Sequence, residues 1–111
     1  MYSGKSVGVV VPAHNEERLI AATLTGIPDY VDYIVVVDDC SQDNTHAVVA
    51  QLAAADPRVV SIRHEVNQGV GGAISTGYVW CRDHDVDIAV VMAGDNQMDP
   101  DDLPALLDAT G

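Results

Sequence analysis

Four short runs of apolar, mostly β-branched residues are spaced along this chain of 111 residues, and polar or acidic residues follow them. The runs are Val7 to Val11, Ile34 to Val37, Val59 to Ile62 and Ile88 to Met92. Each run is nearly continuous in apolar character, which is typical of strands that are buried on both faces of a parallel sheet. The pattern therefore predicts four central strands.

Helical spacing of apolar residues fills the segments between these runs. Leu19, Ile20 and Leu24 mark a first helix, for which Asn15 is the expected N-cap and Gly26 the expected end. The other predicted helices are Ala47 to Ala55, opened by Ser41-Gln42-Asp43, Gly71 to about Arg82, and a last one at Leu103, Leu106 and Leu107, capped by Asp99. Strands that alternate with helices indicate β-α-β units, so we expect a Rossmann-like α/β fold with a mostly parallel four-stranded sheet flanked by helices.

Polar side chains and glycines gather directly after the predicted strands. In open sheets of this kind, ligands bind outside the carboxyl ends of the strands, where helices also begin. The candidate binding residues at this edge are Pro12, Ala13, His14, Asn15, Glu16, Asp38, Asp39, Asn67, Gly69, Gly94, Asp95 and Gln97. One edge of the sheet is thus expected to carry nearly all the chemistry.

Asp38 and Asp39 form a pair of adjacent carboxylates at the end of the second strand. Such a pair repels itself unless a cation or hydrogen-bond donors are present, and a uracil or guanine ring N–H together with ribose hydroxyls would supply donors. The alternative is that Asp38 only starts a turn that leads into the next helix. His14 is likewise either a base contact or a partly buried polar residue.

Asp95 and Gln97 place a carboxylate and an amide two positions apart just beyond the fourth strand, and Gly94 allows a tight turn there. One carboxylate, one weaker oxygen and substrate phosphates form an ordinary site for Mg²⁺ or Mn²⁺. The chain has 17 acidic and only 5 basic residues, so a metal ion would supply the charge that a diphosphate needs. A plain turn is the alternative interpretation.

The glycine-rich segment from Asn67 to Gly77 resembles a phosphate-binding loop but fits neither common form. A dinucleotide fingerprint needs glycine or alanine where Ile74 stands, and a Walker A loop needs lysine where Tyr78 stands. The remaining interpretation is that this segment forms the start of a helix, where small side chains allow a ligand or another helix to approach the backbone closely.

Composition excludes several classes of protein. The formal charge of −12 disfavours nucleic acid as a partner, and no apolar run approaches the ~20 residues that span a bilayer. Cys40 and Cys81 form no C-x-x-C pair, so neither zinc nor redox chemistry is indicated. The first residues lead into a strand and not into a signal-peptide core, which predicts a cytoplasmic location.

Four segments together resemble the successive motifs of family 2 glycosyltransferases, most closely dolichol-phosphate mannose synthase and related polyprenyl-phosphate glycosyltransferases. The segments are 9–17 (VVVPAHNEE), 35–45 (VVVDDCSQDNT), 67–73 (NQGVGGA) and 94–100 (GDNQMDP). The resemblance spans the chain in the right order. It implies the nucleotide-binding half of a GT-A domain and an inverting, metal-assisted transfer from a UDP- or GDP-sugar to a polyprenyl phosphate or saccharide acceptor. In that family the membrane would be reached only through segments outside this chain, at the cytoplasmic face.

The resemblance also assigns roles to single residues. Pro12, Ala13, His14 and Glu16 match the segment that cradles the base, with His14 where tyrosine is common, and Asp38 and Asp39 match the carboxylates that contact base and ribose, Asp39 being the base contact. Asn67, Gly69 and Gly94 complete the implied nucleotide-binding set. Asp95 and Gln97 match the last acid and the glutamine of a D-x-D-x-Q metal motif, whose first aspartate is replaced by Ala93.

Members of this family carry a second half with the acceptor groove and the general base, an aspartate or glutamate that deprotonates the acceptor hydroxyl. We therefore expect residues 1–111 to be the nucleotide-sugar-binding part, which in isolation binds nucleotide but transfers little sugar. Two alternatives remain, a nucleotidyltransferase-type enzyme and a non-catalytic nucleotide-binding or receiver module. A nucleotidyltransferase would need a phosphate loop rich in lysine or arginine, which the sequence does not show. A receiver domain would need an acceptor aspartate at the end of the third strand and a lysine late in the chain, and neither is present.

Overall fold

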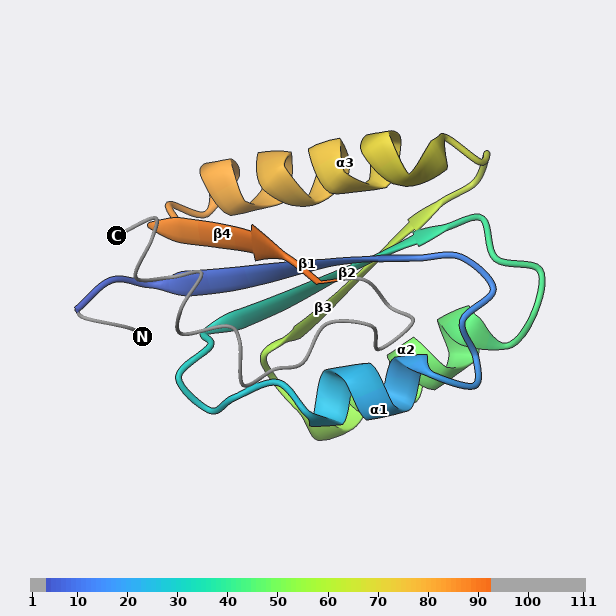
Figure 1. Cartoon of the computed structure of the whole chain (residues 1–111), viewed down its shortest axis with the longest axis horizontal. Coiled ribbons are helices and arrows are strands. Elements are labelled where there is room, and N and C mark those ends of the chain that lie inside the picture. Colours follow the sequence, from blue (N-terminus) through green and yellow to red (C-terminus); the bar gives the residue numbers. More distant parts are fainter. Residues whose placement is uncertain (1–3, 93–111) are drawn as a thin grey trace.

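The computed structural model describes residues 4–92, which form three helices and four strands in strict alternation (Figure 1). The elements are β1 (Val7–Ala13), α1 (Ile20–Thr25), β2 (Tyr33–Asp39), α2 (Thr45–Ala55), β3 (Val59–His64), α3 (Gly69–Asp83) and β4 (Ile88–Val91). The four predicted strands and the first three predicted helices are confirmed. The predicted helix at Leu103 to Leu107 lies outside the described residues.

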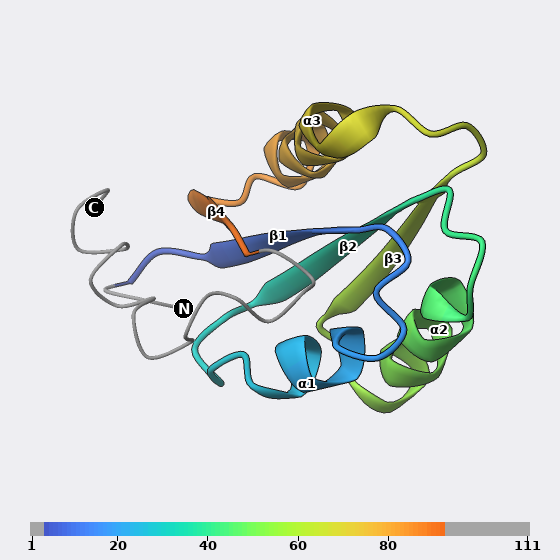
Figure 2. The ribbon, with the colours of Figure 1, turned by 45° about the vertical axis from the view of Figure 1, so that its right-hand side comes forward.

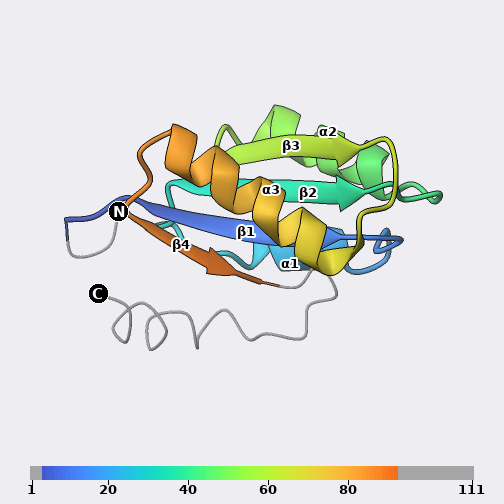
Figure 3. The same ribbon diagram turned by 90° about the horizontal axis from the view of Figure 1, so that it is seen from above.

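All strand pairs are parallel, and the order in the sheet is β3-β2-β1-β4. Helices α1 and α2 cover one face of the sheet, and α3 covers the other (Figure 2). Seen from above, α3 runs over the central strands (Figure 3). The chain moves outward from β1 to β3 and then returns to the other side of β1, so the strand order reverses beside β1. This reversal is the kind of switch point at which open α/β sheets bind ligands.

Alternate side chains of the central strands pack into two separate apolar clusters, one on each face of the sheet. Val9, Val11 and Val36 pack on the side of α1 and α2, whereas Val10 and Val35 pack on the side of α3, and all five are fully buried. Burial on both faces explains why the strands read as continuous apolar runs. No helix within residues 4–92 is long and apolar enough to span a membrane.

Gly77 shows how closely α3 approaches the sheet. A Cβ atom built at this position would lie 2.3 Å from Cγ1 of Val10, well inside van der Waals contact. Gly77 is buried among these contacts, so the absence of its side chain permits the packing of α3 on β1. Close packing of α3 on the sheet therefore explains why residue 77 is a glycine.

Two predicted helix starts differ from the structure. Asn15 is not the N-cap of α1: helix α1 begins at Ile20, and Asn15 adopts a left-handed backbone with φ 54°. Helix α3 begins at Gly69, two residues before its predicted start at Gly71. The opening of α2 is as expected, since a carboxylate oxygen of Asp43 accepts hydrogen bonds from the backbone N–H and the hydroxyl of Thr45.

Candidate functional site

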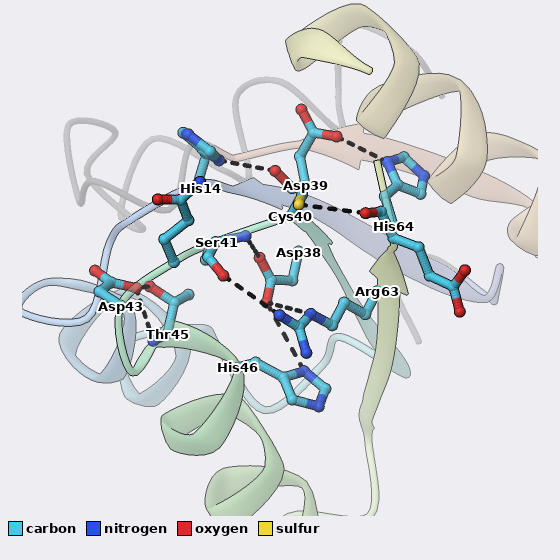
Figure 4. A network of polar contacts seen from close by, with 12 residues as sticks. His14, Asp38, Asp39, Cys40, Ser41, Asp43, Thr45, His46, Arg63 and His64 are labelled. Carbon is cyan, nitrogen blue, oxygen red and sulfur yellow. Dashed lines mark hydrogen bonds and ion pairs between the residues drawn. The ribbon is translucent and has the colours of Figure 1, made fainter. Parts of the chain in front are cut away.

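The carboxyl ends of β1, β2 and β3 bring their following residues to one edge of the sheet (Figure 4). His14 follows β1, Asp38 and Asp39 end β2, and His64 ends β3. The register pairs Asp38 with Arg63 and Asp39 with His64, so residues that are 25 positions apart become direct neighbours. The structure thus places the predicted residues His14, Asp38 and Asp39 at one edge of the sheet, beside Arg63 and His64, which were not predicted.

The loop after β1 is fastened to the loop after β2 by its own polar groups. His14 Nδ1 lies 2.7 Å from the Asp39 carbonyl oxygen, and because a carbonyl only accepts, this ring nitrogen donates. The Asn15 backbone N–H donates to Ser41 Oγ at 2.9 Å, and Asn15 Oδ1 accepts from the Gln42 N–H at 2.9 Å. The left-handed Asn15 therefore acts as a bridge between the two loops.

Asp38 points toward α2, because successive side chains of a strand point to opposite faces. Its Oδ1 accepts from the Ser41 N–H at 2.9 Å, which agrees with the alternative that Asp38 starts a turn. Its Oδ2 is buried and has no hydrogen-bond partner among residues 4–92. His46 Nδ1 lies 3.8 Å from Oδ2 and the guanidinium Nε of Arg63 lies 3.9 Å from it, and both distances are too long for a hydrogen bond.

Asp39 points toward α3, and its carboxylate accepts more hydrogen bonds than that of Asp38. Its Oδ1 accepts from the Gln68 N–H at 2.7 Å and from His64 Nδ1 at 2.9 Å, and its Oδ2 accepts from the Gly69 N–H at 2.8 Å. Burial alone would raise the pKa of the Asp39 carboxyl, but these hydrogen bonds outweigh it and hold the pKa below its ordinary value. Asp39 is therefore ionised at neutral pH.

His64 is a site residue that the sequence analysis missed. Its imidazole is buried between Asp39 and α3, with Nε2 2.8 Å from Thr76 Oγ1. Because the ionised Asp39 has no proton to give, His64 Nδ1 carries the hydrogen of their shared bond. The ring is thus fixed on both sides.

The segment between β3 and α3 also uses its polar groups internally. The Gly69 N–H is shared between Asp39 Oδ2 and Asn67 Oδ1, the latter at 3.0 Å, and Gly69 has φ 81°, a conformation that favours glycine. Asn67 and Gly69, both predicted site residues, are therefore in place beside Asp39. The first amides of α3 are engaged by a carboxylate of the protein itself.

A pocket of about 410 Å³ opens along the β1–α1 loop. It is lined by Asn15, Glu16, Glu17, Arg18, Leu19 and Asp43. Burial raises the pKa of Asp43, but its hydrogen bonds with Thr45 and the Glu17 N–H hold that pKa below its ordinary value. Of the predicted site residues the pocket contains Asn15 and Glu16, and it adds Arg18 and Asp43, which the sequence analysis did not select.

The predicted metal ligands Asp95 and Gln97 lie outside the described residues, as do Ala93 and Gly94. The described chain follows β1 as far as Met92, whose N–H donates to the Val10 carbonyl at 2.9 Å. Within residues 4–92, no three His, Cys, Asp or Glu side chains are grouped so that they could hold a metal ion. The metal site therefore stays a prediction.

A parallel sheet that reverses its order beside β1, with acidic and imidazole side chains at its carboxyl edge, is typical of nucleotide-binding α/β domains. The family description "Glycosyl transferase family 2" matches residues 8–110. The chain therefore belongs to glycosyl transferase family 2, as the resemblance of its motifs indicated.

Two proteins with similar sequences are named as sugar transferases of dolichyl phosphate and undecaprenyl phosphate. The chain is 33% identical to a UDP-N-acetylglucosamine–dolichyl-phosphate N-acetylglucosaminyltransferase of Methanococcus voltae, over 93% of this chain and 46% of that protein. It is 34% identical to an undecaprenyl-phosphate mannosyltransferase of Micrococcus luteus, over 90% of this chain and 42% of that protein. The chain thus spans less than half the length of these relatives.

A solved structure supports the fold as well. The mannosyltransferase PcManGT of Pyrobaculum calidifontis, in complex with GDP-Man and Mn²⁺, superimposes with a TM-score of 0.71 at 30% identity. The match covers 82% of this chain and 28% of that chain. The α/β fold is therefore that of GT-A glycosyltransferases, as predicted.

Proposed function

We propose that the protein that carries this chain is an inverting glycosyltransferase, which moves a sugar from a UDP- or GDP-sugar to a polyprenyl phosphate or a saccharide acceptor. The observation that carries the proposal is that three hydrogen bonds fix the carboxylate of Asp39 at the carboxyl edge of the sheet, in a chain that belongs to glycosyl transferase family 2. The names of the relatives support polyprenyl phosphate as the acceptor class.

In this proposal the described edge binds and orients the nucleotide. Pro12 and Ala13 at the end of β1, together with His14 and Glu16 after it, line the base, and Asp39 accepts a hydrogen bond from it. Because the β1–α1 loop is tied to the loop after β2, these groups are positioned before the ligand arrives, which lowers the entropic cost of binding.

A divalent cation, Mg²⁺ or Mn²⁺, completes the proposal, with Asp95 and Gln97 as its ligands. When bound, such a cation supplies positive charge to the diphosphate as negative charge grows on the leaving group. The Mn²⁺ in the PcManGT complex supports this assignment. Calorimetric titration of the nucleotide with and without Mn²⁺ tests it: Asp95→Ala should remove most of the gain in affinity that Mn²⁺ provides.

We further propose that residues 1–111 supply the nucleotide-sugar site and that the general base and acceptor groove belong to sequence outside them. The acceptor would be met at the cytoplasmic face of a membrane. The isolated chain is then expected to bind nucleotide diphosphate with little acceptor-dependent turnover. A substantial rate of transfer measured on the purified chain would contradict this division.

The decisive experiment measures transfer of a radiolabelled sugar from UDP-N-acetylglucosamine or GDP-mannose into an organic-extractable polyprenyl phosphate product. It is performed on the longer protein that contains this chain and on the chain alone. Label in the lipid fraction and release of nucleoside diphosphate are expected for the longer protein. Release of pyrophosphate from a nucleoside triphosphate and a sugar phosphate would instead favour a nucleotidyltransferase.

A further inference from the structure

The carboxylate of Asp39 has few acceptor positions left for a ligand. An ionised carboxylate offers about four lone-pair positions on its two oxygens. Both positions of Oδ1 are used, by the Gln68 N–H and by His64 Nδ1, and one position of Oδ2 is used by the Gly69 N–H. A single position, on Oδ2, is therefore open to a ligand.

Burial strengthens this restriction. The side chain of Asp39 is only 5% exposed, so a ligand meets little more than one edge of the carboxylate. The two donors to Oδ1 are also hard to displace, because the Gln68 N–H is a backbone group at the start of α3 and His64 is itself buried and fixed by Thr76. A ligand must use the open position or displace one of these donors.

The two candidate bases differ in the number of donors that they present. Guanine presents two adjacent donors, N1–H and N2–H, which suit a carboxylate with one free position on each oxygen. Uracil presents one donor, N3–H, between two carbonyl groups. Against Asp39, guanine would leave one N–H without its carboxylate partner, and an unpaired donor in a site that excludes water weakens binding.

We propose that the sugar donor of this protein carries uracil, and that His64, by occupying the second position of Asp39 Oδ1, is the residue that sets this preference. The inference rests on the proposed function, in which Asp39 contacts the base. Family membership alone does not decide the base, since one relative is named for a UDP-sugar and PcManGT is complexed with GDP-Man.

Calorimetry on the 111-residue chain with UDP, GDP and N3-methyl-UDP, each with Mn²⁺, tests the proposal. We expect UDP to bind at least about tenfold more tightly than GDP, and N3-methyl-UDP to lose about tenfold relative to UDP, since one buried hydrogen bond is worth about that factor. Equal or tighter binding of GDP, or unchanged binding of N3-methyl-UDP, would overturn the choice of uracil and leave the glycosyltransferase proposal standing. Failure of both UDP and GDP to bind would overturn the proposed function together with this inference.

A pair of variants at His64 separates its role in specificity from a role in stability alone. His64→Leu frees the second position of Oδ1 and should reduce the ratio of GDP to UDP dissociation constants by about threefold or more. His64→Asn keeps an N–H close to the place of Nδ1 and should retain most of the ratio. A loss of affinity that is equal for both nucleotides in His64→Leu would assign His64 a structural role and contradict its part in base choice.

Discussion

Asp38 and Asp39 are neighbours in the sequence, yet they lie on opposite faces of the sheet and in different polar surroundings. On the α2 face, Asp38 receives one hydrogen bond, and its Oδ2 is buried without a hydrogen-bond partner among residues 4–92. On the α3 face, Asp39 receives three hydrogen bonds, two of them from the first amides of a helix. The comparison shows that a pair of acids in a motif need not act as a pair, because strand alternation gives each its own set of donors.

The largest effect is expected where α3 touches the sheet. Gly77→Ala places a Cβ atom against Val10 and should lower the free energy of unfolding by about 3 kcal/mol, because the close contact must be relieved by movement of the helix. Gly71→Ala is the matched control in the same helix, since nothing lies within 4 Å of the added atom, and it should be neutral or stabilising by up to about 1 kcal/mol. Urea denaturation followed by circular dichroism measures both. Equal stability of the two variants would show that the α3 face does not depend on this contact.

The two aspartates provide the most direct test of the comparison. Asp39→Asn replaces one acceptor oxygen by an N–H₂ group, so at least one of its three donors loses its partner, at a cost of about 2 kcal/mol in stability. Nucleotide affinity should fall by at least about tenfold. Asp38→Asn can keep its oxygen toward the Ser41 N–H and should cost within about 1 kcal/mol. If Asp38→Asn proves the more harmful in both measurements, the assigned difference between the faces is wrong.

Acid titration extends the comparison. Hydrogen bonds hold the pKa of Asp39 below that of an ordinary, unfolded-state aspartate, so the unfolded state binds a proton more readily than the folded state. The stability supplied by Asp39 is therefore fully present above about pH 4, and it is lost as the pH falls through the lowered pKa. Asp39→Asn should flatten this acid limb in a series of thermal melts between pH 6 and pH 2.5. The unaltered chain serves as the reference, and an unchanged slope in Asp39→Asn would contradict the assignment.

The smallest effect is expected at His46. Its side chain is 42% exposed and its Nδ1 lies 3.8 Å from Asp38 Oδ2, so the pair forms no direct hydrogen bond. His46→Ala should therefore change the free energy of unfolding by no more than about 0.5 kcal/mol at pH 7. A loss above about 2 kcal/mol would indicate that Asp38 relies on His46 as strongly as Asp39 relies on its own partners.

The strands were predictable because burial on both faces imposes a continuous apolar run, which sequence alone displays. Asn15 was misassigned because asparagine suits both an N-cap and a left-handed turn, and the choice was decided by contacts with Ser41 and Gln42 that are distant in sequence. His64 was missed because it stands in no recognisable motif, and only the register of β2 against β3 brings it to Asp39. Thr76 lies in the glycine-rich segment, but only its contact with His64 connects it to the site. The alternation of Asp38 and Asp39 between faces was already implied by the two-residue period of a strand.

The attachment of Asp39 to the amides of Gln68 and Gly69 means that the ligand site and the first turn of α3 share one side chain. If a bound nucleotide makes the Asp39 carboxylate less free to move, openings of that turn become rarer, and thermodynamic linkage then requires that an intact turn favours the nucleotide equally. Slower hydrogen exchange at these two amides would therefore register occupancy of the edge without any chemical label.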